Sequence, residues 1–203
     1  MADDNFSRYF NTLAELPRTS DATDRAGESL PLETALRRAM EMARTTHRRG
    51  NKLMFIGNGG SAAIASHMAI DYSKNGGMRS LAFNDPAALT CLGNDHGYEH
   101  VFAKQLEFHA VAGDFLIAIS SSGRSENIIR GVEMARSLSC QILTLTSFNG
   151  DNPLRRLGDL NIYVATSAYG FAEISHLTLC HAILDRAVEL SANRTLAQQQ
   201  ELV

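Results

Sequence analysis

Cysteine is scarce in this chain, and no two cysteines are closely spaced. The 203 residues include three, Cys91, Cys140 and Cys180, and none of them forms a CxxC pair. An odd number of widely separated cysteines argues against a disulfide framework and favours a reducing compartment. We therefore expect a cytoplasmic protein without structural disulfides.

Long apolar runs and blocks of one charge are also missing. No stretch approaches the ~20 apolar residues of a membrane span, and the acidic N-terminus lacks the apolar segment of a signal peptide. Lys and Arg number 19 against 22 Asp and Glu, for a formal net charge of −3. This balance gives no general electrostatic reason to bind nucleic acid or an anionic membrane. We expect a soluble protein whose partner is a small molecule.

The content of 44% hydrophobic and 20% charged residues excludes a disordered chain, a collagen-like fibre and a coiled coil. Apolar spacing predicts a helix over residues 5–16, and turn formers predict a linker over 17–31. A second helix is predicted over 32–49, ended by Gly50. We divide the chain into an N-terminal helical segment and linker (1–31), one main domain (32–192) and a C-terminal tail (193–203).

Beyond residue 51, short apolar runs alternate with helical segments. The predicted strands are 52–57, 79–83, 114–120, 141–146 and 161–165. The predicted helices between and after them are 61–74, 86–92, 96–110, 125–138 and 171–192. This alternation predicts an α/β fold, a three-layer αβα sandwich with a mainly parallel five-stranded sheet, plus the N-terminal helices. Ligands of such sheets bind outside the carboxyl ends of the strands.

Two strand ends have the composition of phosphate-binding loops. Asn58, Gly59, Gly60 and Ser61 follow the first predicted strand and open a helix, where free N–H groups attract anions. A tight turn with a helix cap is the alternative, and the spacing does not match a dinucleotide fingerprint. The third predicted strand ends in a hydroxyl-rich turn suited to a phosphate monoester. Its serines are Ser120, Ser121, Ser122 and Ser125.

The segments FIGNGGSAA and ISSSGRSENII together resemble a SIS domain, the sugar-isomerase fold. The sequence is more specifically similar to the phosphoheptose isomerase family, through CLGNDHGYEHVFAKQL, AGDFLIAISSSGRS and LTLTSFNGD. The resemblance covers about residues 32–190. It implies a phosphosugar substrate, with Asn58, Asn94 and Asp95 near the sugar, and a homotetramer with active sites between subunits.

His67 and Asp71 lie four residues apart and share one face of a predicted helix. From spacing alone, the pair fits half of a divalent-metal site or an ordinary hydrogen bond. On the last helix, His176 and His181 stand among apolar residues, where histidines are usually buried core residues. The resemblance implies a Zn²⁺ site, or a site for another divalent metal, made by His67, Asp71, Glu173 and His181.

Three positions depart from the family pattern. Asp71 replaces a glutamate, Glu173 replaces a glutamine, and Gly170 stands where an acid is often found. Glu173 and His181 are eight residues apart. On a straight helix this spacing separates them by about 80° around the axis and ~12 Å along it. Both reach one ion only if Glu173 lies at a frayed helix start, and His176 is a possible substitute.

The resemblance implies aldose–ketose isomerisation through an enediol, most specifically of sedoheptulose 7-phosphate. Asp71 is the candidate base and His181 the candidate acid, with Glu173 as the alternative base. Two other functions stay open: a non-catalytic SIS module that binds a phosphosugar or a protein, and an isomerase of another sugar phosphate.

Overall fold

The computed structural model describes residues 6–200. Their strands form one seven-stranded sheet in the order β2-β1-β7-β6-β5-β3-β4. The strands are β1 Asp21–Asp24, β2 Ser29–Leu30, β3 Leu53–Gly57, β4 Ser80–Ala82, β5 Phe115–Ser120, β6 Gln141–Thr146 and β7 Leu160–Tyr163. Neighbours from β4 through β7 run parallel, whereas β1 is antiparallel to both β7 and β2.

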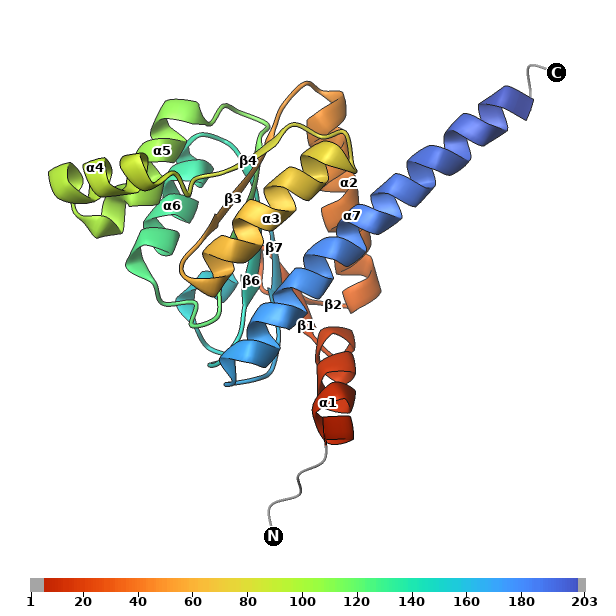
Figure 1. Cartoon of the computed structure of the whole chain (residues 1–203), viewed down its shortest axis with the longest axis horizontal. Helices are drawn as coiled ribbons and strands as arrows, with labels where there is room; N and C mark the ends of the chain where they lie inside the picture. Colours follow the sequence, from red (N-terminus) through yellow and green to blue (C-terminus); the bar gives the residue numbers. More distant parts are fainter. Residues whose placement is uncertain (1–5, 201–203) are drawn as a thin grey trace, which may run out of the picture.

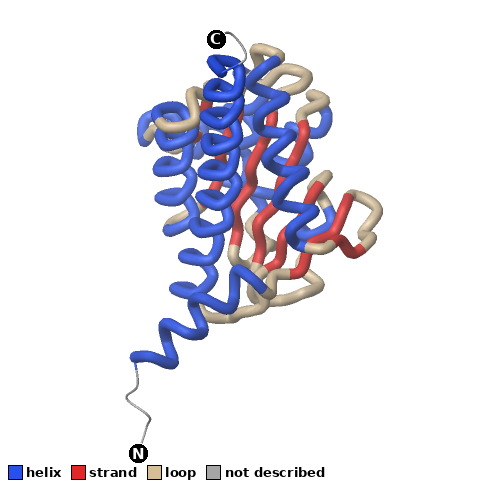
Figure 2. Tube along the Cα trace, turned by 90° about the vertical axis from the view of Figure 1, so that its right-hand side faces the viewer, coloured by secondary structure: helices blue, strands red, loops and turns tan. Residues whose placement is uncertain are grey.

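Helices cover both faces of this sheet (Figure 1; Figure 2). The longer helices are α1 Phe6–Arg18, α2 Leu32–Arg48, α3 Gly60–Lys74, α4 Pro86–His96, α5 Val101–His109, α6 Glu126–Ser137 and α7 Tyr169–Gln200. Two 3₁₀ turns are also present: η1 Tyr98–His100 lies between α4 and α5, and η2 Pro153–Arg156 lies between β6 and β7. In Figure 1, α4, α5 and α6 lie on one side of the sheet and α2, α3 and α7 on the other.

The apolar runs of the strands explain the two helical layers. Successive side chains of a strand point to opposite faces, so a strand covered on both sides is apolar throughout. On β3, Phe55 packs into the cluster with α2, α3 and α7, while Met54 and Ile56 pack into the cluster with α5 and α6. The predicted three-layer α/β class is confirmed.

The predicted strand count of five is wrong, because two further strands lie in the segment predicted to be a linker. β1 has the sequence Asp-Ala-Thr-Asp, which carries no apolar run, and it is a strand because it pairs with β7 from Asp21↔Tyr163 to Asp24↔Leu160. The hairpin to β2 turns at Asp24, whose Oδ1 accepts hydrogen bonds from the N–H groups of Ala26 (2.9 Å) and Glu28 (3.0 Å).

Several helix boundaries also differ from the prediction. α4 continues to His96 and ends at Gly97, whose φ is +86°. The helix predicted over 96–110 is therefore interrupted near its start, and the chain continues as η1 and then α5. α7 begins at Tyr169 and runs to Gln200, beyond the predicted end at 192. Most of the predicted tail therefore continues the helix, and residues 201–203 lie outside the described part.

α1 packs against the start of α7, below the sheet in Figure 1. The rings of Tyr9 and Phe171 have centroids 4.7 Å apart at this contact. Phe6 and Phe10 on the same helix are exposed. Within residues 6–200, none of the helices combines the length and the apolar character needed to cross a membrane.

Candidate active site

The two predicted phosphate loops lie side by side at the carboxyl ends of β3 and β5. These strands are parallel neighbours in register, with Gly57 opposite Ile119. The loops enclose a cavity of about 250 Å³ together with the first turns of α7. Its lining residues are Asn58, Gly59, Gly60, Ser61, Ile119, Ser120, Ser121, Ser122, Ser125, Tyr169 and Glu173. We call this cavity the loop pocket. Tyr169 is a lining residue that the sequence patterns did not indicate.

The first loop is shaped by glycine. Gly59 has a φ of +55°, a conformation that favours glycine, and its carbonyl accepts the hydrogen bonds of Ala62 and Ala63 that begin α3. A Cβ atom on Gly57 would overlap the backbone of Ser61. The chain can therefore turn from strand to helix within three residues, and the first turn of α3 faces the pocket with its positive dipole end.

The serines of the second loop divide into two groups. Ser120 Oγ accepts a hydrogen bond from Gly123 N (3.2 Å), and Ser122 Oγ accepts one from Arg124 N (3.3 Å). Ser121 Oγ is buried without a partner among the described residues, and Ser125 precedes α6 without a capping bond from its side chain. Since a hydroxyl that accepts a hydrogen bond keeps its own O–H, all four serines can donate to an anion.

An amide pair closes one side of the pocket. Asn58 Nδ2 donates to Asn127 Oδ1 (2.8 Å), and Asn127 Nδ2 donates back to Asn58 Oδ1 (2.9 Å). The Tyr98 hydroxyl also donates to Asn58 Oδ1 (3.3 Å). Asn127 stands in the predicted second loop motif, Ser-Glu-Asn. Its pairing with Asn58, 69 residues earlier, could not be predicted from the sequence.

Asn94 and Asp95 do not line the loop pocket. They lie exposed near the end of α4, where Asn94 Nδ2 donates to Asp95 Oδ1 (2.8 Å) and the Cys91 thiol lies 3.6 Å from Asp95 Oδ2. Their predicted role beside the sugar stays a prediction.

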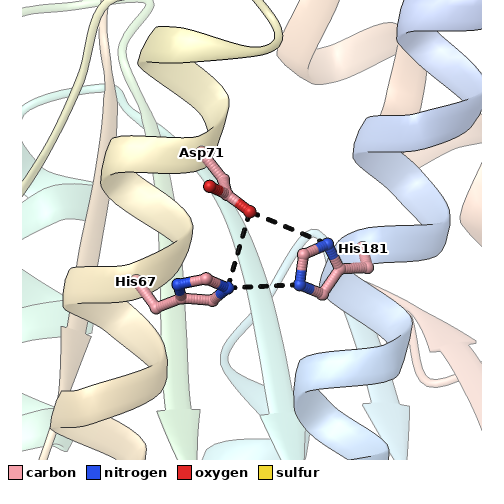
Figure 3. A group of neighbouring side chains, drawn as sticks. All are labelled: His67, Asp71 and His181. Atoms are coloured by element: carbon pink, nitrogen blue, oxygen red, sulfur yellow. Dashed lines mark hydrogen bonds and ion pairs between the residues drawn. The ribbon is translucent and has the colours of Figure 1, made fainter.

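Three of the four predicted metal ligands meet between α3 and α7 (Figure 3). His67 Nε2 lies 3.3 Å from His181 Nε2 and 3.5 Å from Asp71 Oδ2, and Asp71 Oδ2 lies 3.9 Å from His181 Nδ1. Tetrahedral zinc, with bonds of about 2.1 Å, separates its ligand atoms by roughly 3.4 Å. Taking one nitrogen from each histidine and one oxygen from Asp71, the ligand atoms lie within 4.8 Å of one another, close enough for small side-chain rotations to bring them around one divalent cation. We call His67, Asp71 and His181 the histidine group.

Glu173, the fourth predicted ligand, is not part of this group in the structure. Its carboxylate lies against Gly60 in the loop pocket, at the place where a Cβ atom of residue 60 would be. Glu173 and His181 are eight positions apart, which corresponds to ~12 Å along a regular helix, and α7 is helical from Tyr169 onward. Because α7 does not fray at Glu173, it does not bring the two side chains to one point.

His176, the possible substitute ligand, is not accessible to a metal ion either. The side chain is wholly buried, and burial lowers its pKa to about 4, although a hydrogen bond to the Thr146 carbonyl acts in the opposite direction. Nε2 lies 3.1 Å from that carbonyl and 3.2 Å from Ser147 Oγ. His176 therefore links α7 to the end of β6 as a neutral side chain.

Comparisons with known proteins agree with this architecture. The family model described as "SIS domain" matches residues 23–147, which is more than half of the chain. A curated phosphoheptose isomerase of Aliarcobacter butzleri is 37% identical over 158 residues, which cover 75% of this chain and 83% of that protein.

Two solved structures are similar over most of the chain. The phosphoheptose isomerase of Neisseria gonorrhoeae superimposes with a TM-score of 0.75 and 28% identity, over 90% of this chain and 94% of the other. The phosphoheptose isomerase of Francisella tularensis superimposes with a TM-score of 0.77 and 25% identity, over 93% of this chain and 99% of the other.

The sheet with its two strand-end loops is thus that of a SIS domain. The chain belongs to the SIS domain family and, within it, to the phosphoheptose isomerases.

Proposed function

We propose that the protein is an aldose–ketose isomerase that acts on a phosphosugar, most specifically sedoheptulose 7-phosphate. The observation that carries this proposal is the shared arrangement of α3 and α7. Both helices border the loop pocket at their first turns and carry the histidine group about two turns further on. The separations of seven residues on α3 and eight on α7 correspond to ~10–12 Å. A sugar phosphate has its phosphate and its carbonyl at opposite ends, so one substrate can engage both places.

The phosphate end would be held by the loop pocket. The hydroxyls of Ser61, Ser120, Ser121, Ser122 and Ser125 and the first-turn N–H groups of α3 supply donors suited to an anion. Asn58 and Asp95 are assigned to the sugar hydroxyls, with Asn94 beside them. Binding by neutral donors fits a chain whose net charge is −3.

The reacting end would meet the histidine group. Asp71 removes a proton from the carbon next to the carbonyl, and His181 donates a proton to the carbonyl oxygen, so that an enediol forms. Asp71 then gives its proton to the former carbonyl carbon, while His181 takes a proton from the hydroxyl on the neighbouring carbon, which becomes the new carbonyl. Both groups regain their starting protonation states, and aldose and ketose are exchanged with no net redox change. Oδ2 of Asp71 faces both histidines, which leaves Oδ1 to accept the proton. Glu173 is the alternative base.

His67, Asp71 and His181 would hold the divalent metal, with zinc as the first candidate. Such an ion supplies positive charge that stabilises the negative charge developing on the substrate oxygens. His67 is 50% exposed and His181 34% exposed at the side chain in one copy of the chain. A homotetramer that covers this surface would exclude water from the reaction, and sedimentation of the purified protein measures whether it forms.

Turnover of ketose phosphates with five to seven carbons tests the proposal. We expect turnover of the seven-carbon substrate, its loss on chelation, and at least ~100-fold slower turnover in His181→Ala, since general acid–base groups contribute about 10²–10⁴-fold. His47→Ala, an exposed histidine on α2, is the matched control. Substrate binding without turnover would instead identify a non-catalytic SIS module, and preference for a shorter sugar would identify a different isomerase.

A further inference from the structure

The loop pocket contains a carboxylate at the place where an anionic group would bind. Glu173 extends from the first turns of α7 across the pocket to Gly60, and the missing side chain at residue 60 leaves the space that it occupies. Gly60 is the first residue of α3, so the carboxylate lies at the positive end of that helix.

No lysine or arginine is among the described residues that line this pocket, and Glu173 is the one carboxylate among them. The nearest arginine in sequence, Arg124, is directed elsewhere: its Nη2 donates to Asp151 Oδ1 at 3.2 Å. Among residues 6–192, whose side chains are described, Glu173 has no hydrogen-bond or ion-pair partner. An incoming phosphate therefore meets a negative charge and no side-chain cation that offsets it.

Taking the proposed phosphosugar site as given, we propose that Glu173 is a specificity-determining residue that excludes free phosphate from this site. In the ligand-free protein its carboxylate takes the place of the anion at the start of α3. Inorganic phosphate must displace that charge with only its own contacts to the loops. A phosphosugar also gains contacts from its sugar, and these allow it to displace Glu173.

The same geometry separates this role from metal binding. Within one chain, a fourth ligand would have to reach the histidine group about two turns further along α7, and the structure directs Glu173 to Gly60 instead. Replacing the carboxylate should therefore change the affinity for anions and leave the affinity for a divalent cation unchanged.

The experiment measures the binding of inorganic phosphate by calorimetry to the full chain and to Glu173→Gln, which keeps the shape of the side chain. Two like charges a few ångströms apart near a protein surface repel strongly enough to change an affinity at least about tenfold. We expect Glu173→Gln to bind phosphate at least ~10 times more tightly than the unmodified chain. The matched control is Glu126→Gln, which removes a charge next to Ser125 whose carboxylate pairs with Arg130 (2.8 Å) outside the pocket.

Titration with Co²⁺ in the same variants provides the second measurement, and we expect equal affinity in all three proteins. Equal phosphate affinity in Glu173→Gln and the unmodified chain would overturn the proposal, as would an equal gain in Glu126→Gln. Weaker Co²⁺ binding in Glu173→Gln would make Glu173 a metal ligand and also overturn it. Both measurements are independent of turnover, so a failure of the isomerase assay alone leaves this inference standing.

Discussion

His67 on α3 and His181 on α7 face each other with their Nε2 atoms 3.3 Å apart, although 114 residues separate them in the chain. Asp71 Oδ2 lies 3.5 Å from the His67 nitrogen on the same side (Figure 3). Two imidazole nitrogens at this distance either share one proton or bind one cation through their lone pairs. The carboxylate beside them stabilises positive charge in either case, and the proposed metal site corresponds to the second.

Removal of either histidine should therefore weaken metal binding. Changes in groups that merely orient a metal ligand cost about 10–100-fold in affinity, so loss of a ligand should cost at least as much. We expect His67→Ala and His181→Ala each to bind Co²⁺ at least ~100 times more weakly, measured from the visible spectrum of the bound ion. His47→Ala should bind Co²⁺ like the unmodified chain. Unchanged affinity in either histidine variant would contradict the three-ligand group.

The amide pair of Asn58 and Asn127 predicts energetic coupling between the two phosphate loops. Asn127 is 3% exposed, so Asn58→Ala leaves a buried amide without its partner, at a cost of about 1–3 kcal/mol. Asn127→Ala should cost a similar amount. Because both variants break the same two hydrogen bonds, the double variant should cost less than their sum by about 0.5–3 kcal/mol. Urea unfolding of the four proteins measures this difference. Additive losses would show that the pair does not join the loops.

The central strands and the two loops were predictable because their signals are local. An apolar run such as Phe115–Ser120, followed by small and polar residues, marks a buried strand and the loop at its end. Parallel strands place such loops at one edge, which is how Ser61 and Ser121 come to line the same pocket. His67 and Asp71 were recognisable as a pair because helical spacing places them on one face.

The remaining features depend on partners that are distant in sequence. β1 is polar and becomes a strand only through its pairing with β7, so nothing within the segment itself predicts it. The direction of Glu173 depends on how α7 is rotated against α3, which the apolar stripe of the helix does not specify finely enough. The contact of Tyr169 with Phe148, with ring centroids 4.8 Å apart, likewise follows from the path of the chain between β6 and α7.

Gly123, in the serine loop, should be intolerant of a side chain for two reasons. Its φ of +60° is costly for other residues, and a Cβ atom there would overlap the side chain of the buried Asn152. Asn152 caps η2 by accepting a hydrogen bond from Arg155 N (3.0 Å), so it cannot move freely. Gly27 has a φ of +84° and nothing within 4 Å of its Cβ position, so a side chain there has only the conformational cost and no steric overlap.

We therefore expect Gly27→Ala to lower the free energy of unfolding by about 1–2 kcal/mol. Gly123→Ala should lower it by at least ~1 kcal/mol more, since small-to-large changes in packed sites cost typically 1–3 kcal/mol. Chemical denaturation of the two variants gives both values. Equal losses would mean that Asn152 yields to the new methyl group without cost.

His176 makes the stability of the fold dependent on pH. Burial holds its pKa at about 4 in the folded chain, whereas an unfolded histidine titrates near about 6.5. The unfolded state therefore binds the proton first as the pH falls, and the fold loses stability progressively between about pH 6.5 and pH 4. A difference of about 2.5 pH units corresponds to roughly 3 kcal/mol from this one side chain.

His176→Gln removes this titration and keeps an amide that can donate to the Thr146 carbonyl, 3.1 Å from Nε2 in the structure. We expect the variant to be less stable than the unmodified chain at pH 7, because the packed ring is lost, but to lose about 3 kcal/mol less on going from pH 6.5 to pH 4. Urea unfolding at several pH values measures both the stability at pH 7 and its loss with acidity. His47→Gln, at an exposed histidine, is the control. If His176→Gln and the unmodified chain show the same decline with acidity, other groups cause it and His176 is protonated without unfolding.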